Sequence, residues 1–229
     1  MYLFLNKYFN LQKKLSSRNE VRDNGSCLTR DFDKKKEKLK ELCTDFDYPA
    51  ELVELIEEKK IFEYLGYQFT SEGSAYSDGR IVIYYDPAMT DARMACCLAH
   101  ELQHQRYFAV QKAFNSEPID GPLHNRFAIF SSSRLSDERG ISAYSEEHWR
   151  AWQGTSLPVL FSDEFLMGQS EPINETIAEI AKAYYNWGRI DWIPQLWRDL
   201  YESINEEYEN LEMSKGRHNS KLDRYRESV

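Results

Sequence analysis

The chain has few cysteines and no long apolar run. Its four cysteines include the adjacent pair Cys96 and Cys97, and they match neither a disulfide framework nor the CxxC spacing of a zinc ribbon. No stretch of about 18 apolar residues is present, so we expect no membrane-spanning helix and no membrane partner. The apolar segment 1–5 lacks a leading positive charge and a small-residue cleavage site. We therefore expect a cytoplasmic protein without a secretory signal.

The composition argues against a disordered chain and against a nucleic-acid partner. Hydrophobic residues make up 41% of the 229 residues and aromatic residues 14%, enough for one sizeable core. Residues 1–40 carry a net charge of +6, which leaves −15 on the rest of the chain. The acidic body has no basic, aromatic-interleaved surface pattern, so we interpret the basic start as solvated helix. Nothing in the sequence indicates an oligomeric state.

Histidine is scarce too, with five residues in the chain, yet two of them stand in one short motif. His100, Glu101 and His104 form an HExxH pattern, and on a helix they fall within a single arc of about 100°. Two imidazoles at this spacing are typical zinc ligands, and the carboxylate between them is placed to take a proton from water. The motif predicts a zinc site, and two structural histidines on an amphipathic helix are the alternative.

The residues around the motif favour the zinc interpretation. The segment 79–85 is rich in β-branched and aromatic residues, and Asp86-Pro87 ends it, so it is predicted to be a strand followed by a turn. Thr90 or Asp91 can cap the helix that follows, whose other residues are mostly small or apolar. The HExxH motif is therefore expected on a packed helix that ends near residue 114.

A catalytic zinc with two histidines needs a third ligand. The segment 172–187 is a predicted helix, begun by a proline and ended by a glycine, and it carries Glu175 and Glu179 on one face. We predict that Glu175 is the third ligand and that Glu179 orients a ligand histidine from outside. His124 is one alternative third ligand, and the cluster Glu146, Glu147 and His148 is the other.

The remaining segments are predicted to be scaffold. The predicted helices lie at 1–22, from Asp31 or Asp33 to about 48, at 49–64 and at 192–213; strands at 66–70 and 79–85 form a hairpin, and 115–140 is irregular with at most one short helix. The fold class is α+β, mainly helical, with a small sheet packed on the HExxH helix. We divide the chain into an N-terminal helical arm (1–64), a catalytic domain (65–213) and a flexible tail (214–229).

The order of the motifs resembles a known family. His100-Glu-Leu-Gln-His104, then Ile141-Ser-Ala-Tyr144, then Glu175-Thr-Ile-Ala-Glu179 is similar to gluzincin-type zincin metallopeptidases, most closely the anthrax lethal-factor-like catalytic domain. The resemblance covers about residues 65–190. It implies one zinc ion on His100, His104 and Glu175, with Glu101 as general base and Tyr144 stabilising the oxyanion. Tyr144 and Glu175 are farther apart than in the family, which leaves Tyr184 and Tyr185 as alternatives to Tyr144.

These residues together predict a zinc metalloendopeptidase with a polypeptide substrate. Zinc-activated water would attack a peptide carbonyl as Glu101 takes its proton. The substrate is expected to add as a strand along 80–85, in contact with Ile81, Ile83 and Tyr85, if that strand is the sheet edge. The alternatives are a zinc-containing accessory protein without catalysis, phage- or virulence-associated, and a metal-free helical module.

Overall fold

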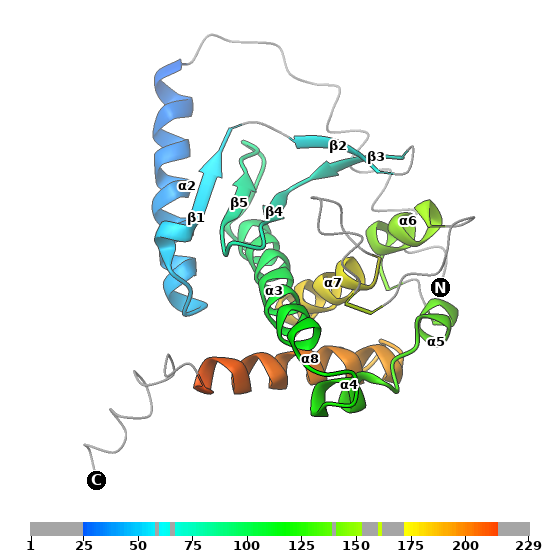
Figure 1. The fold of residues 1–229 in the computed structure, drawn as a ribbon. Coiled ribbons are helices and arrows are strands. Elements are labelled where there is room, and N and C mark those ends of the chain that lie inside the picture. The colour runs from blue at the N-terminus through cyan, green and yellow to red at the C-terminus, as the bar shows by residue number, and fades with distance from the viewer. Residues whose placement is uncertain are drawn as a thin grey trace.

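A long helix, α3 (Asp91–Ser116), runs through the middle of the molecule and contacts the sheet as well as helices α7 (Pro172–Trp187) and α8 (Gln195–Ser214) (Figure 1). The structure is a computed structural model that describes residues 25–57, 60–64, 67–138, 141–152, 160–161 and 172–214. Its architecture is α+β, as predicted, with more helix than strand. The sheet therefore packs on the helix that carries the HExxH motif.

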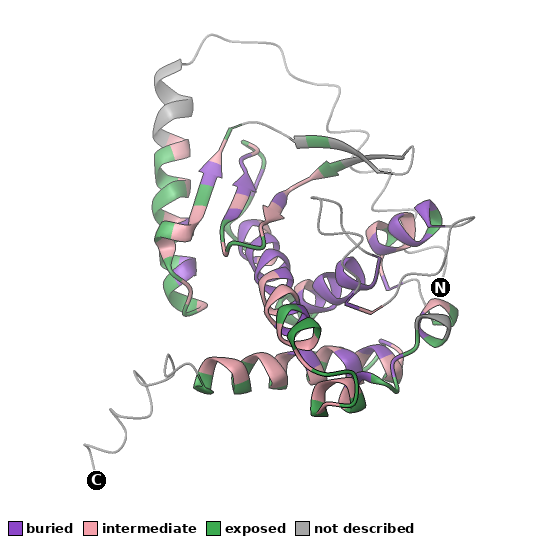
Figure 2. Cartoon of the chain, in the orientation of Figure 1, coloured by how far each residue is buried: buried purple, intermediate pink, exposed green. Residues whose placement is uncertain are grey.

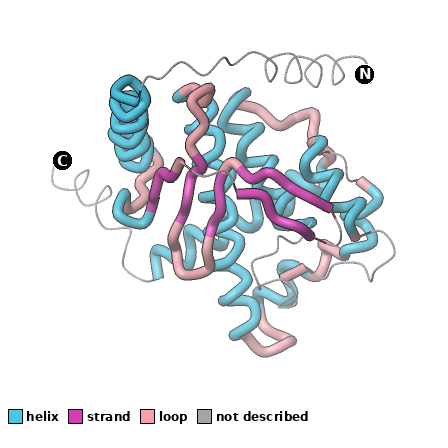
Figure 3. Tube along the Cα trace, turned by 90° about the horizontal axis from the view of Figure 1, so that it is seen from above, coloured by secondary structure: helices cyan, strands magenta, loops and turns pink. Residues whose placement is uncertain are grey.

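The sheet that contacts α3 has three strands of mixed direction. Strand β5 (Ile81–Tyr84) lies in the centre, with β1 (Val53–Ile56) parallel to it on one side and β4 (Gly73–Ala75) antiparallel on the other. Strands β2 (Lys60–Tyr64) and β3 (Tyr67–Ser71) form a separate antiparallel pair that continues beside the sheet (Figure 3). Strand β4 is thus an edge strand of the three-stranded sheet.

The remaining described helices surround this centre. They are α2 (Gly25–Asp45), the 3-10 turn η1 (Ala50–Leu52), α4 (Pro122–Phe127), α5 (Ser132–Asp137) and α6 (Ala143–Ala151). Helix α2 packs on α3 and β1, and α6 packs on α7. Among the described residues, no helix is both long and apolar enough to cross a membrane.

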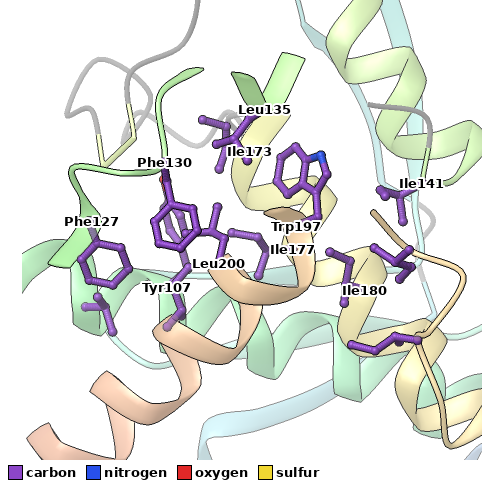
Figure 4. Close-up of a cluster of buried hydrophobic side chains, with 14 of the residues drawn as sticks. Tyr107, Phe127, Phe130, Leu135, Ile141, Ile173, Ile177, Ile180, Trp197 and Leu200 are labelled. Carbon is purple, nitrogen blue, oxygen red and sulfur yellow. The ribbon is translucent and has the colours of Figure 1, made fainter. Parts of the chain in front are cut away.

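Helix α3 belongs to two hydrophobic clusters. Near its start, Met94 and Leu98 pack with β1, β5 and α2, whereas Tyr107 and Val110 pack farther along with α7 and α8. Figure 4 shows the second cluster, in which Trp197 lies among side chains from α7 and α8. Most residues of α7 and half of those of α3 are buried (Figure 2). The helices that carry the predicted site are therefore held rigidly by core packing on several sides.

The predicted helix over 49–64 is wrong. This segment forms η1, β1 and β2, and β1 pairs with β5 in the register Leu55 to Ile83. The apolar spacing of Leu52, Leu55 and Ile56 suits a helix, but the neighbouring strand offers hydrogen bonds and a buried position for Leu55. The domain boundary placed at residue 64 therefore separates a strand from its own sheet.

Other predicted boundaries have mixed outcomes. Helix α7 has its predicted ends and is followed by Gly188 with a φ of 67°. Thr90 caps α3, because its side chain accepts a hydrogen bond from the Arg93 amide. Helix α2 begins earlier than predicted. The strand that forms the hairpin with β5 is β4 and not β3. The region 115–140 holds two short helices, where at most one was predicted. The helix predicted at 1–22 and tail residues 215–229 lie outside the described residues.

Three cysteine side chains lie among those that the structure describes. Cys43, Cys96 and Cys97 are free thiols, and the first and last of them are buried. Cys97 lies fully within the cluster around the start of α3, and burial raises the pKa of its thiol well above the usual range. A buried thiol with a raised pKa is a packing residue and not a nucleophile.

Candidate metal site

His100 and His104 lie one turn apart on α3, and both side chains are buried. Their rings are nearly perpendicular, with centroids 4.7 Å apart, and the two Nε2 atoms lie 3.1 Å from each other. The helix therefore points both imidazole nitrogens at one spot, as the four-residue spacing predicts.

Helix α7 brings Glu175 to the same spot. Its carboxylate oxygens lie 3.3 Å from His100 Nε2 and 3.6 Å from His104 Nε2. With metal–ligand distances of about 2.0–2.2 Å, two ligands of a tetrahedral ion are separated by roughly 3.3–3.6 Å. The 3.1 Å between the two Nε2 atoms is close to this value, and so are the two contacts of Glu175, which use its two different oxygens. In the part of the chain that the structure describes, these three residues form the group able to hold a metal ion.

Two outer side chains fix the orientation of the histidine rings. Asn174 Oδ1 lies 2.9 Å from His104 Nδ1, and Glu179 Oε1 lies 3.1 Å from His100 Nδ1. When the proton of each neutral ring lies on Nδ1, facing its oxygen, both Nε2 atoms keep a lone pair directed toward the other and toward Glu175. Lone pairs repel one another at this distance, so a cation has to lie among them, either a proton or a metal ion. The donor set therefore fits a metal ion.

The charges of the metal-free site lead to the same conclusion. Burial by itself would lower the pKa of His100, but its contacts with Glu175 and Glu179 outweigh burial and raise the pKa to about 10. Burial lowers the pKa of His104 to about 4. Burial opposes ionisation of Glu175, yet the neighbouring histidines hold its pKa well below the usual range. One proton on His100 thus partly balances the buried carboxylates, and a metal cation would replace that charge.

Glu101 follows His100 on α3 and lies against strand β4. Its side chain is buried, and its carboxylate accepts a hydrogen bond from the backbone amide of Ala75. Burial raises the pKa of Glu101 to about 7, with His100 opposing the shift and Glu175 adding to it. A carboxylate with a pKa near neutrality suits the transfer of a proton in both directions.

Tyr144 also reaches the site, from the first turn of α6. Its ring centroid lies 6.2 Å from that of His100 and 4.8 Å from that of His148. Burial, followed by the carboxylates of Glu175 and Glu101, raises the pKa of Tyr144 well above its usual range, which keeps the hydroxyl protonated as a hydrogen-bond donor. The structure thus places Tyr144 beside His100.

The alternatives to Tyr144 and to Glu175 do not join the two histidines in the described group of ligands. Tyr184 and Tyr185 are exposed near the end of α7. His124 contacts the Phe114 carbonyl, ten residues beyond His104 and so about 15 Å farther along α3. Glu146 faces Arg150 on α6, whereas the buried His148 packs on Tyr144. The structure therefore joins Glu175 to the two histidines and leaves Glu146 outside the group.

The predicted substrate-binding strand is a further correction. Ile81, Ile83 and Tyr85 are buried, and β5 lies between β1 and β4, so both of its edges are already hydrogen-bonded. A peptide cannot add to a central strand. The edge next to the site is β4, whose short sequence Gly73-Ser-Ala75 carries too little apolar pattern to be recognised as a strand.

Several residues of the site were not predicted. Asn174 directly precedes Glu175 and touches the second histidine, and Lys182, one turn beyond Glu179, donates a hydrogen bond of 3.2 Å to it. Helical spacing from Glu179 could have indicated Lys182, whereas Asn174 is at neither i±3 nor i±4 from the two glutamates. No sequence signal indicated that Gly73 of β4 lies against Glu101 of α3, because only the fold brings this strand and this helix together.

Comparison of the chain with protein-family models, with curated proteins and with solved structures gave no significant match. The functional argument therefore depends on the residues of the site themselves.

Replacing either outer residue is expected to weaken metal binding moderately. In Asn174→Ala and Glu179→Ala the ligands remain but one histidine loses its orienting partner, so we expect the zinc affinity to fall about 10–100-fold. A chelator-competition titration measures this change. Asn125→Ala is a matched control, because Asn125 is exposed and its side chain bonds only to the Asp120 carbonyl within the described contacts. An unchanged affinity in both variants would contradict the orienting role.

Proposed function

We propose that the protein is a zinc-dependent metallopeptidase. The observation that carries the proposal is the convergence of His100, His104 and Glu175 beside the buried carboxylate of Glu101. Two histidines and one glutamate form a three-ligand set of the kind that catalytic zinc uses, with a fourth position left for water. The order of these residues along the chain, which resembles gluzincin-type zincins, supports the same class.

The donor set favours zinc over the hard cations. Calcium and magnesium prefer six or more oxygen ligands, whereas this site offers two imidazole nitrogens and one carboxylate. The separations of 3.1, 3.3 and 3.6 Å are compatible with the tetrahedral geometry of zinc. Other transition metals also accept imidazole, so metal analysis decides the identity.

Each remaining residue has a defined task in peptide hydrolysis. A zinc ion held by the three ligands would act as a Lewis acid toward water and the peptide carbonyl. Glu101 accepts the proton that the attacking water loses and passes it to the leaving amine. Tyr144, whose hydroxyl stays protonated, donates a hydrogen bond to the developing oxyanion. Asn174 and Glu179 hold the histidine rings in position.

The outer edge of β4 is the proposed binding surface for the peptide. The Tyr84 amide donates to the Glu72 carbonyl and the Tyr76 amide to the Arg80 carbonyl, so the even-numbered residues face β5. Gly73 and Ala75 therefore direct their backbone groups to the outer edge, where the described residues include no pairing strand. An added peptide would compete there with the contacts of Ser71 to Gly73 and of the Ala75 amide to Glu101. An extended peptide added there would run beside Glu101.

Metal analysis combined with peptide cleavage tests the proposal. We expect one zinc per chain in the purified protein, cleavage within a peptide library, loss of cleavage after chelation and recovery with added zinc. Protein that neither contains zinc nor takes it up would contradict the metal site. A zinc-loaded protein that cleaves no peptide would instead support a zinc-containing protein without catalysis.

A further inference from the structure

Gly73, on strand β4, is the closest approach of the sheet to Glu101. A Cβ built at Gly73 would lie 2.5 Å from Glu101 Oε1, 2.7 Å from its Cγ and 2.8 Å from its Cδ. Carbon atoms in proteins do not approach this closely, since van der Waals contact begins at about 3.5 Å. Any side chain at position 73 would therefore overlap the proposed general base.

The backbone conformation does not explain the glycine. Positive φ angles occur at Gly79 and Gly188 among the described glycines, and Gly73 is not one of them. An alanine could therefore adopt the backbone of residue 73 without strain. The glycine is required for space next to Glu101 and not for its conformational freedom.

Strand β4 cannot easily move away to make room. Arg93 on α3 forms a two-nitrogen ion pair with Glu72, the residue just before Gly73, with Nε 3.0 Å from Oε1. The Gly73 amide donates to Ser71 Oγ at 3.3 Å, and the Ser71 hydroxyl donates to the Gly73 carbonyl. Since β4 is also paired with β5, a methyl group at position 73 would displace Glu101 before it displaced the strand.

We propose that Gly73 is a positioning residue for the general base: the missing side chain lets the Glu101 carboxylate lie against β4, where the Ala75 amide holds it. The catalytic part of this inference depends on the proposed peptidase function. Displacement of Glu101 by about 1 Å breaks the bond to Ala75 and misaligns proton transfer, and such a shift can cost about 100-fold in rate. The three atoms nearest to the added methyl group all belong to Glu101, and none of them belongs to a metal ligand.

The first test is the Gly73→Ala variant. We expect kcat for peptide cleavage to fall about 100-fold or more, with KM and zinc affinity within about threefold of wild type. Gly121→Ala is a matched control, because a Cβ there would also meet a glutamate, Glu117. This glutamate follows the last residue of α3, 13 residues beyond His104. We expect this control to lose stability and keep full activity. Full activity in Gly73→Ala would overturn the proposal.

A denaturation cycle tests the contact without using activity. Urea midpoints of the metal-free wild type, Gly73→Ala, Glu101→Ala and the double variant show whether the two positions interact. We expect Gly73→Ala to lower the midpoint in the wild-type background and to have little effect once Glu101 is alanine. An equal drop in both backgrounds would overturn the proposal.

The same four proteins also test the proposal if the Gly73→Ala variant does not fold. If Gly73→Ala gives no folded protein, the double variant with Glu101→Ala is expected to fold, and its failure would overturn the proposal. A wild-type protein that holds zinc and cleaves no peptide would end the peptidase assignment. The denaturation cycle would still decide whether Gly73 places the Glu101 carboxylate.

Discussion

Replacing Glu101 with glutamine is expected to lower peptide hydrolysis about 10²–10⁴-fold while zinc stays bound. Glutamine has the same size but cannot accept the proton from water, so the loss corresponds to about 3–5 kcal/mol of transition-state stabilisation. Glu101 is not among the three residues whose ligand atoms converge, so zinc affinity should stay close to that of wild type. Steady-state kinetics and metal analysis of the same preparation measure both effects.

A control variant, measured for hydrolysis and for stability, makes this prediction specific. Glu54→Gln is a matched control, because Glu54 is exposed on β1, at the opposite edge of the sheet from β4. It should leave hydrolysis and stability unchanged. If Glu101→Gln instead keeps full activity, or loses its zinc, Glu101 has been given the wrong role.

Glu175→Ala is expected to abolish both zinc binding at micromolar concentration and peptide hydrolysis. The substitution removes one of three ligands, so the affinity should fall well beyond the about 100-fold that marks the loss of an outer residue. The fold itself should survive, because the buried carboxylate that is lost lies between histidines and is not a packing residue of the hydrophobic clusters. Competition with a chromophoric chelator and circular dichroism measure the two properties.

Variants of the alternative ligand cluster, Glu146, Glu147 and His148, test which residue is the third ligand. Glu147→Ala and His148→Ala should keep zinc bound, since neither side chain belongs to the convergent group in the described residues. His148→Ala removes a buried ring that packs on Tyr144, so it is expected to lower stability and kcat. Normal zinc binding by Glu175→Ala, together with zinc loss in one of these two variants, would assign the ligand to α6 and contradict the lethal-factor-like resemblance.

The two histidines of the candidate metal site on α3 could be predicted because their geometry is local. His100 and His104 share a face wherever a helix forms, and the cap at Thr90 and the small apolar residues around the motif indicated that helix. Glu175 and Glu179 were predictable for the same reason, since α7 has a proline near its start and Gly188 after its end. Helical periodicity was sufficient to find the four side chains.

The error at residues 49–64 shows where periodicity is not sufficient. The apolar positions of this segment fit a helix, yet β1 forms because β5, about 30 residues away, provides a partner for Leu55. Short apolar segments of this kind have no decisive local preference, and the neighbouring strand selects their structure. The same pairing buries β5 and leaves β4 at the edge, which moved the proposed peptide surface from Ile81 and Ile83 to Gly73 and Ala75.

The sequence by itself determined the groups of the candidate site: two histidines one turn apart, an acid between them and two more acids on a second helix. These relations lie within single helices, where residue spacing fixes direction. Only the tertiary structure decided which acid meets the histidines, that Tyr144 lies beside His100, and that Gly73 borders Glu101. Those contacts join elements separated by about 30 to 75 residues, and long-range packing alone sets such distances.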